Sequence, residues 1–351
     1  MIPNTGEVRR RRVAHARGRL GDVAERFAGR PLVLSSCASV AWATGAISSP
    51  IDRVAATDPV WVVYRDGEMT LVTSSVEFER LSADYDLDDL GFDLVSAPWY
   101  EEHAHRRRVE ALVGTDCASD VEGLGVDATF ELTRARLGLC GAEIEVLGGL
   151  SRVASDAVEA VLDQWRPGES SDREIAAQVA RHLETYGAEA VCLIVGADER
   201  LSRFRHPLMR GDVTRRSVMV VVVARALGLH VALTRLASVE DEIDESLMER
   251  CELVHERVRD ATRVGATWGD LYSALAQGYR EVGQPDAWRE PVAAGCAIAF
   301  NPSLAGGAKI EDTYVVGGDE LTCLTSSPRW PRPAGANTGA GVLRLREEKA
   351  T

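Results

Sequence analysis

Lysine is almost missing from the sequence. Only Lys309 and Lys349 occur among the 351 residues, so the other 38 of the 40 basic residues are arginine. A Schiff-base mechanism needs a lysine amine as its nucleophile. Lys309 is the only plausible residue for chemistry of that kind.

Paired cysteines are missing as well. The seven cysteines are an odd number, and no two of them lie within three residues of each other. Neither a disulfide framework nor a zinc-binding pattern is therefore visible. The N-terminal segment is polar and arginine-rich, and the longest aliphatic run, Val218–Ala224, is too short to span a bilayer. These absences predict a cytoplasmic protein with no membrane association, and they make Val218–Ala224 a buried strand.

The charge balance excludes one class of partner. The formal net charge is −14, from 54 acidic and 40 basic residues. An acidic surface repels phosphate backbones, so nucleic acid is not expected as a partner. Two short basic clusters, at 9–12 and 106–108, are interpreted as solvated helix faces beside acidic neighbours.

The first third of the sequence predicts a small α/β domain. Residues 8–27 have the spacing of an amphipathic helix. Asp66-Gly67 lies between two apolar runs and predicts a hairpin turn, because this pair tolerates the positive φ that such turns need. We place the end of this domain at residue 143, which gives expected domains of 1–143 and 144–351.

The second domain is expected to begin with a helix over 144–165. Two later helices have similar starts and ends, with a possible N-terminal cap and a glycine stop. The positions are Ser171, Glu174 and Gly187 for the first, and Thr267, Asp270 and Gly283 for the second. Such a repeat favours a pseudo-two-fold domain, although two unrelated helices would give the same signal. The remaining sequence predicts strands at 217–224, 230–236, 295–301, 309–316 and 321–325.

Six segments carry sequences that look like known motifs. They are Ser39–Gly45, the helix start at Gly168, Arg205–Pro207 followed by Gly211-Asp212, Ala224–Arg235, Ala299–Ser303 and Gly306–Asp312. The last one, Gly-Gly-Ala-Lys-Ile-Glu-Asp, is the most specific. In this order and spacing the segments resemble the creatinase / aminopeptidase P / prolidase superfamily, the pita-bread metallopeptidases.

This resemblance implies an α/β (α+β) fold. It consists of a creatinase-like N-terminal α/β domain and a C-terminal pita-bread domain, and family members usually form homodimers. In the Xaa-Pro aminopeptidases and their metallopeptidase relatives, two aspartates, one histidine and two glutamates hold two divalent metals. Such a metal pair activates a water and stabilises the tetrahedral intermediate.

The metal ligands do not carry over to this sequence. The two aspartate positions fall on Val221 and Ala232, and the first glutamate position falls on Asn301. Only the second glutamate remains, as Glu311, and no histidine occurs after His255. Valine and alanine offer no lone pairs, and one carboxylate with a neutral amide cannot hold two hard ions. The sequence therefore predicts a metal-independent protein without a cofactor.

The resemblance leaves a reduced set of chemical groups. His206 occupies a position where family members place a proton-handling histidine, and an imidazole titrates near neutral pH. Glu311 is its candidate carboxylate partner, so these two are the expected catalytic residues. The candidate substrate-binding residues are Arg235, Asn301, Lys309 and Thr313. Two alternatives stay open: His206 is an ordinary loop residue, or Lys309 and Glu311 form a structural ion pair.

Two classes of function therefore compete. The first is a metal-independent, hydrolase-like enzyme that cleaves a C–N or related bond in a small amino-acid-like or amidine-like substrate. The second is a catalytically inactive homologue retained for binding, dimerisation or regulation. Fold alone cannot choose between them. An enclosed polar pocket that contains both His206 and Glu311 would favour the enzyme.

The lost ligands generate a prediction about metal content. Purified protein should contain well below one equivalent of Mn, Co, Zn or Fe by mass spectrometry, because four of the five ligand positions are changed or missing. Stoichiometric metal that a chelator removes together with an activity would contradict this expectation.

A second prediction concerns assembly. Light scattering should give about twice the chain mass of 38.0 kDa, because the superfamily that the sequence resembles usually forms symmetric dimers. A monomer that persists across a wide range of concentrations would show that this chain does not share that property.

Overall fold

The computed structural model describes most of the chain in two units. The described residues are 1–47, 51–239, 243–283, 297–300, 303–304, 308–316, 321–327, 330–331 and 342–345. One compact unit is Pro3–Val146, and the other joins Met1–Ile2 to Leu147–Thr351. The division falls inside helix α7 (Gly141–Asp163). The boundary expected after residue 143 lies near the start of the same helix.

The N-terminal unit is built on a six-stranded sheet with the order β4-β3-β2-β1-β5-β6. The strands are β1 (Leu32–Ser36), β2 (Thr57–Arg65), β3 (Glu68–Ser74), β4 (Phe92–Ala97), β5 (Ala118–Ser119) and β6 (Val126–Asp127). β2 pairs in antiparallel fashion with both β1 and β3, whereas β3–β4, β1–β5 and β5–β6 are parallel. The mixed sheet confirms the expected α/β domain.

Helices complete this unit. They are α1 (Gly6–Arg26), α2 (Cys37–Ala43), α3 (Ser75–Asp84), α4 (Leu87–Leu90), α5 (Ala104–Val113) and α6 (Thr129–Leu137). The apolar stripe of α1 is buried as its spacing predicts, since Val13 and Leu20 share a core cluster with Leu34 and Val62 of the sheet. The hairpin turn also forms as expected, because Asp66 and Gly67 both adopt positive φ between β2 and β3.

The described residues of the C-terminal unit form two sheets and a short hairpin. A four-stranded sheet has the order β15-β9-β8-β7, a three-stranded sheet has the order β10-β13-β14, and β11 pairs with β12. The strands are β7 (Glu189–Ala197), β8 (Ser217–Ala226), β9 (Leu229–Val239), β10 (Ala297–Phe300), β11 (Ser303–Leu304), β12 (Ala308–Lys309), β13 (Asp312–Val316), β14 (Leu321–Cys323) and β15 (Val342–Leu345). The apolar run at Val218–Ala224 is the buried centre of β8, as the sequence indicates.

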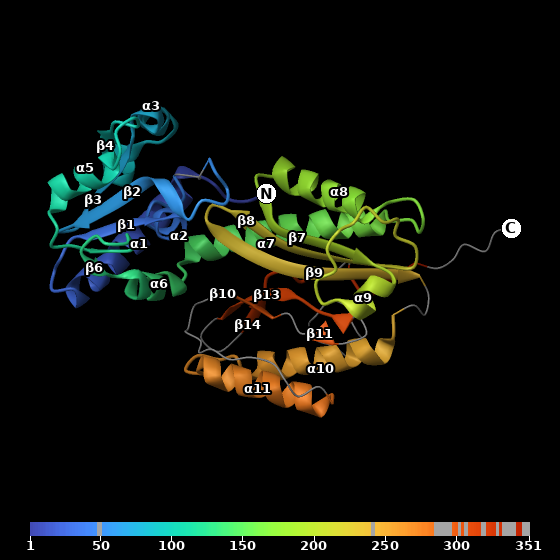
Figure 1. Cartoon of the computed structure of the whole chain (residues 1–351). Coiled ribbons are helices and arrows are strands. Elements are labelled where there is room, and N and C mark those ends of the chain that lie inside the picture. Colours follow the sequence, from blue (N-terminus) through green and yellow to red (C-terminus); the bar gives the residue numbers. More distant parts are fainter. Residues whose placement is uncertain are drawn as a thin grey trace. The chain divides into compact units, whose positions relative to one another are not determined.

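Helices lie on both outer sides of these sheets. Besides α7, they are α8 (Asp172–Thr185), α9 (Glu199–Arg203), α10 (Glu245–Ala261) and α11 (Trp268–Glu281). Figure 1 shows α7 and α8 beside β7–β9, and α10 and α11 on the other side of β13 and β14. The result is a layered helix–sheet–sheet–helix unit. An isolated bridge between Thr234 and Glu311 joins its two sheets at the centre.

The helix starts and ends follow the sequence closely. Capping boxes form between Ser171 and Glu174 on α8 and between Thr267 and Asp270 on α11. Positive φ just beyond each helix falls on the expected glycines, Gly187 and Gly283. These local signals are confirmed, while a two-fold superposition of the two helices stays a prediction. In the part of the chain that the structure describes, no helix is both long and apolar enough to cross a membrane.

A buried acid and a buried base face each other between α10 and β13. Glu252 and His255 lie one turn apart on α10, with 3.9 Å between His255 Nδ1 and Glu252 Oε1, and the Tyr314 hydroxyl lies 3.0 Å from His255 Nε2. Burial, aided by Glu256, raises the pKa of Glu252 to about 8, while burial and Arg259 lower the pKa of His255 to about 4. Both side chains are therefore neutral in the folded protein near pH 7.

This pair predicts how stability depends on pH. Unfolding restores the ordinary pKa of Glu252, 4.5, so stability falls as pH rises from about 4.5 to about 8, where only the folded state keeps the proton. For His255, with an ordinary pKa of 6.5, stability rises with pH between about 4 and 6.5. The two trends offset each other up to pH 6.5, and the loss from Glu252 remains above it.

The difference in the free energy of unfolding between Glu252→Gln and wild type should therefore shift by about 2 kcal/mol in favour of the variant from pH 6.5 to 8. The reason is that the amide has no proton to lose over this range. Urea unfolding at pH 5, 6.5 and 8 measures this gain. Glu249→Gln, an exposed change on the same helix, is the control. Parallel stability curves for Glu252→Gln and wild type above pH 6.5 would contradict the raised pKa.

Candidate active site

Glu311 lies at the junction of the two sheets. Its backbone oxygen accepts a hydrogen bond of 3.0 Å from the amide of Thr234 on β9, and its Oε2 accepts one of 2.7 Å from the Thr234 hydroxyl. The residue is buried, with 4% of its surface exposed. The one carboxylate that remains at the metal-ligand positions of the resembled family is therefore held at both its backbone and its side chain by Thr234 of β9.

Lys309 supplies a positive charge beside this carboxylate. Lys309 Nζ lies 3.6 Å from Glu311 Oε2, and the lysine is only 3% exposed. Burial lowers the pKa of Lys309 because an ammonium loses its hydration in the interior. The negative charge of Glu311 raises this pKa and the positive charge of Arg205 lowers it, with the net effect downward. The structure thus brings together two of the candidate site residues, Lys309 and Glu311.

The positions aligned with the two metal-binding aspartates are apolar. Val221 on β8 lies opposite Thr234 of β9 in the antiparallel register. Ala232 of β9 lies opposite Val223, two residues further along each strand. Val221 belongs to a buried apolar cluster with Met219 and Leu236. Within the described ranges, no group of three or more His, Cys, Asp or Glu side chains could hold a metal ion. Asn301, the next ligand position, lies outside the described residues.

Thr313 closes the other end of this junction. Its hydroxyl accepts a hydrogen bond of 2.8 Å from the Ala232 amide and donates one of 2.8 Å to the Ala232 carbonyl oxygen. The Thr313 hydroxyl thus takes the place of a backbone group as the hydrogen-bond partner of Ala232, at the point where β13 approaches β9. Thr313 and Glu311 are two residues apart, as strand alternation requires for a common face.

Arg235 points into a different network. The guanidinium is 1% exposed and lies 3.0 Å from Asp312 Oδ1 and 3.4 Å from Glu159 Oε1. It also donates a hydrogen bond of 2.6 Å to the Thr325 carbonyl oxygen and stacks over Trp330 at 6.0 Å. The contact with Arg235 shows that Asp312 points away from Glu311. The structure therefore places Arg235 inside the protein fold, between α7, β9 and β13.

His206 lies on the loop that follows α9. Its side chain is exposed, while the next residue, Pro207, is buried. A Cβ atom at Gly196 of β7 would collide with the ring of Pro207, so the loop lies directly on that strand. The preceding residue, Arg205, is close enough to Lys309 for its charge to act on the lysine. His206 itself makes no hydrogen bond or ion pair with any residue that the structure describes.

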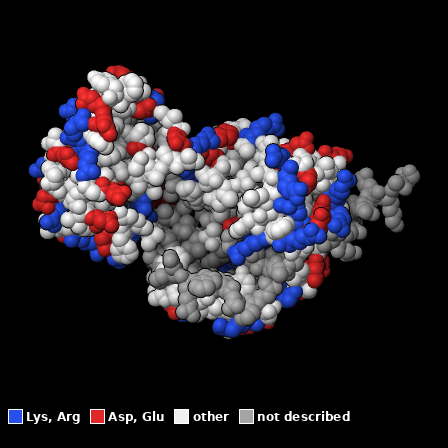
Figure 2. All heavy atoms as spheres, viewed as in Figure 1, with Lys and Arg blue, Asp and Glu red and all other residues white. Residues whose placement is uncertain are grey.

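Basic side chains surround this loop. Arg203, Arg205, Arg210, Arg215 and Arg216 are exposed. Figure 2 shows Lys and Arg gathered on the surface where α9 lies. Two of these arginines have acidic neighbours, Arg210 with Asp212 at 3.7 Å and Arg216 with Glu199 at 3.9 Å. This surface is cationic although the chain as a whole is strongly acidic.

Several site residues were not predicted from the sequence. Thr234 and Cys192 were not singled out, although Thr234 belongs to one of the motif-like segments. Cys192 is half-buried on β7, opposite Val223 of β8, and lies near Lys309. Pairing the predicted strands β7, β8 and β9 in register could have identified Cys192, because cross-strand neighbours on one face of a sheet lie close together.

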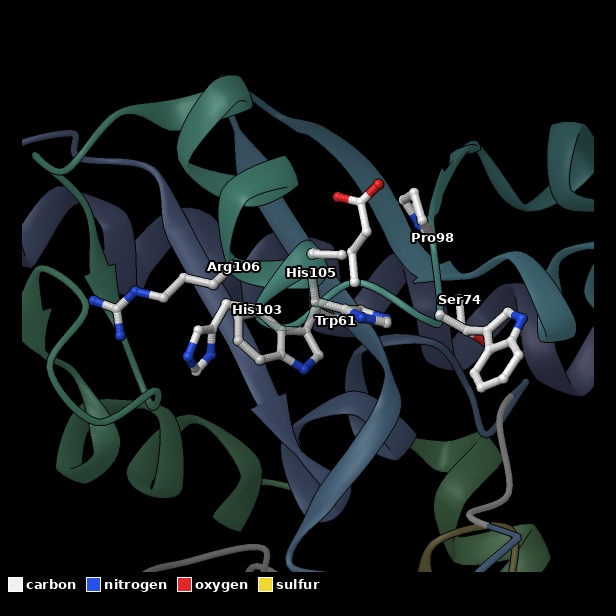
Figure 3. Close-up of a pocket in the computed structure, with 9 residues that line it drawn as sticks. Trp61, Ser74, Pro98, His103, His105 and Arg106 are labelled. Carbon is white, nitrogen blue, oxygen red and sulfur yellow. The ribbon is translucent and has the colours of Figure 1, made fainter.

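A separate pocket lies in the N-terminal unit. It encloses about 320 Å³ and is lined by Trp61, Ser74, Pro98, Trp99, Glu101, His103, Ala104, His105 and Arg106. Trp61 and His105, both labelled in Figure 3, lie side by side in its wall with their ring centroids 6.0 Å apart. His105 Nε2 lies 3.1 Å from the Pro59 carbonyl oxygen, and burial lowers the pKa of this imidazole. Arg106 is bound to Glu110 at 2.9 Å and to the Gly123 carbonyl oxygen. The Arg106 guanidinium and the His105 imidazole in this pocket are thus engaged in contacts within the N-terminal unit.

Comparison with known protein families gives one match, which lies within the C-terminal unit. Residues 149–317 match the model of metallopeptidase family M24. A comparison with curated protein sequences finds no match.

Solved structures resemble the whole chain at low sequence identity. The Xaa-Pro dipeptidase from Bacillus anthracis is 15% identical, with a TM-score of 0.73 over 95% of this chain and 100% of that one. Dipeptidase PepE from Mycobacterium ulcerans is 18% identical, with a TM-score of 0.73 over 97% and 98%. The prolidase from Pyrococcus horikoshii OT3 is 16% identical, with a TM-score of 0.70 over 90% and 99%. At these identities the similarity shows a shared two-domain fold.

Proposed function

Because this chain belongs to the pita-bread metallopeptidase superfamily, as a divergent member, we propose that it is an enzyme that works without a metal. Membership of family M24 suggests a hydrolytic or peptidase-like function. The proposed substrate is a small amino-acid-like or amidine-like molecule, and the proposed reaction cleaves a C–N or related bond. Side chains supply the acid–base catalysis.

The Lys309–Glu311 pair carries this proposal. In the family, a carboxylate at the position of Glu311 binds a metal, whereas here the ammonium of Lys309 lies 3.6 Å from it. Lys309 replaces the arginine of the family motif, so a positive charge at this position is common to both. The difference lies in Val221 and Ala232, which occupy two ligand positions and offer no lone pair to a metal. The lysine thus supports a site whose positive charge belongs to the protein itself.

The polar groups have complementary proposed roles. The Lys309 ammonium can donate hydrogen bonds to an oxygen that gains negative charge during the reaction. Glu311, oriented by Thr234, can accept a proton or hold a cationic group of the substrate. His206, on the exposed loop, is proposed to exchange protons with the leaving group. Asn301 is proposed to hydrogen-bond the substrate.

Arg235 and Thr313 are proposed to fix the strands that carry the site residues. Arg235 is bound to Glu159 and Asp312 and follows Thr234 directly in β9, so we assign it a positioning role. Thr313 connects β13 to Ala232. The remaining proposals concern context: a small-molecule substrate, a cytoplasmic location and a homodimer.

The proposal predicts the behaviour of two variants. With a panel of dipeptides, N-acyl amino acids and amidines, and with a chelator present, wild type should turn over at least one compound. His206→Ala should lower kcat by about a hundredfold or more, the usual contribution of a general acid or base. Glu311→Gln should lower it comparably. The melting temperature of His206→Ala should stay near that of wild type, because the side chain is exposed.

His182→Ala is the matched control, because this histidine lies on α8 beside Tyr186 and away from the proposed chemistry. It should keep wild-type turnover. Activity that requires added metal and disappears with chelator would refute metal independence. Wild-type rates in both variants would refute the two catalytic assignments.

A further inference from the structure

Arginine side chains gather around the segment that joins α9 to β8. Residues 204–216 form this connection without a helix or strand of their own, and irregular connections of such length are usually functional. Arg173, on the first turn of α8, lies beside Gly211 of the segment. We call the following exposed side chains the arginine surface: Arg173, Arg203, Arg205, Arg210, Arg215 and Arg216. In a chain of net charge −14, this surface inverts the local sign of the charge.

Several guanidinium groups of the arginine surface have no partner. Arg203, Arg205 and Arg215 make no side-chain hydrogen bond or ion pair with the residues that the structure describes. Arg210 has Asp212 at 3.7 Å, but both side chains are more than half exposed, so water screens most of this attraction. The positive charge of this surface is therefore available to an anionic partner.

The nearest buried or half-buried carboxylates are committed to the backbone of the segment. Asp172 accepts hydrogen bonds of 2.9 Å and 2.8 Å from the amides of Arg210 and Gly211. Asp198 accepts one of 2.7 Å from the amide of Arg216. These contacts fix the course of the segment without neutralising its guanidinium groups. A surface that is already ordered loses less conformational entropy when it binds a partner.

Apolar side chains lie among the arginines. Phe204, Leu208 and Val213 are 50%, 66% and 41% exposed. Arg200 holds two of them in place, because its guanidinium lies over the Phe204 ring at 4.9–5.1 Å scale contact distance, 5.1 Å to the centroid, and donates a hydrogen bond of 3.0 Å to the Leu208 carbonyl oxygen. A guanidinium binds a carboxylate through two parallel hydrogen bonds. The surface thus offers carboxylate-binding groups and apolar contacts together.

We propose that the arginine surface is a docking site for an acidic peptide segment of another protein, in which Asp or Glu alternates with Leu or Phe. A short peptide contacts this surface alone. Duplex DNA or an anionic bilayer would also face the rest of a chain whose net charge is −14, which repels it. The exposed apolar side chains favour a peptide further, since a phosphate backbone offers them no apolar partner. The docking site is an addition to the chemistry proposed above.

Fluorescence anisotropy with a labelled peptide of alternating Glu and Leu tests the proposal on the full chain. The peptide should bind at low ionic strength and more weakly at physiological salt, because salt screens exposed charges. Arg203→Gln combined with Arg205→Gln should weaken binding at least about tenfold, since both guanidinium groups lose their carboxylate partners. Arg250→Gln combined with Arg263→Gln is the matched control. These exposed residues lie on α10 and just after it, and their loss changes the net charge equally.

Comparison of probes decides the chemical class of the partner. A peptide with Ser in place of Leu should bind several-fold more weakly, and duplex DNA and phosphatidylserine vesicles should bind more weakly than the Glu–Leu peptide. The proposal is overturned if wild type does not bind this peptide at low salt, or if the two double variants bind it equally. It is also overturned if the Ser peptide binds as well, or if DNA or vesicles bind more tightly. Each readout is binding, so none of these results bears on turnover.

Discussion

The guanidinium of Arg235 joins segments that are far apart in the chain. It contacts Glu159 on α7, Asp312 on β13 and the backbone of Thr325, and these partners lie between 76 and 90 residues away in the sequence. Two buried carboxylates facing one another would repel, and removal of the cation between them typically costs about 3–5 kcal/mol. This one cation therefore fixes how β13 meets β9.

The polar centre depends on that junction. Once Arg235 and Asp312 occupy one side of the crossing, alternation along the strand turns Glu311 to the other side, where Thr234 fixes its carboxylate. Thr313 closes the crossing through the backbone of Ala232. The pair of Lys309 and Glu311 is thus rigid because two neighbouring residues of β9, Thr234 and Arg235, hold opposite sides of the same connection.

Local chemistry in the sequence was sufficient for much of the fold. The capping boxes of α8 and α11, the Asp66-Gly67 turn and the apolar run of β8 depend on residues a few positions apart, so spacing alone predicted them. The sequence also offered a Lys309–Glu311 ion pair as one alternative, and the two charged groups lie 3.6 Å apart. The roles of Arg235 and Thr234 did not, because their partners come from distant segments. The sequence Thr234-Arg235 alone does not reveal that Thr234 faces Glu311 while Arg235 faces Glu159 and Asp312.

The close approach of Gly196 to Pro207 limits how this site can diverge among related sequences. Only a residue without a Cβ allows the ring of Pro207 to lie on β7, and Arg205 and His206 immediately precede that ring. Any larger residue at position 196 would lift the loop, together with its positive charge, away from Lys309. A substitution at position 196 would therefore require a compensating change at Pro207 or in the rest of the loop. Position 196 and the loop residues are thus expected to co-vary among related sequences.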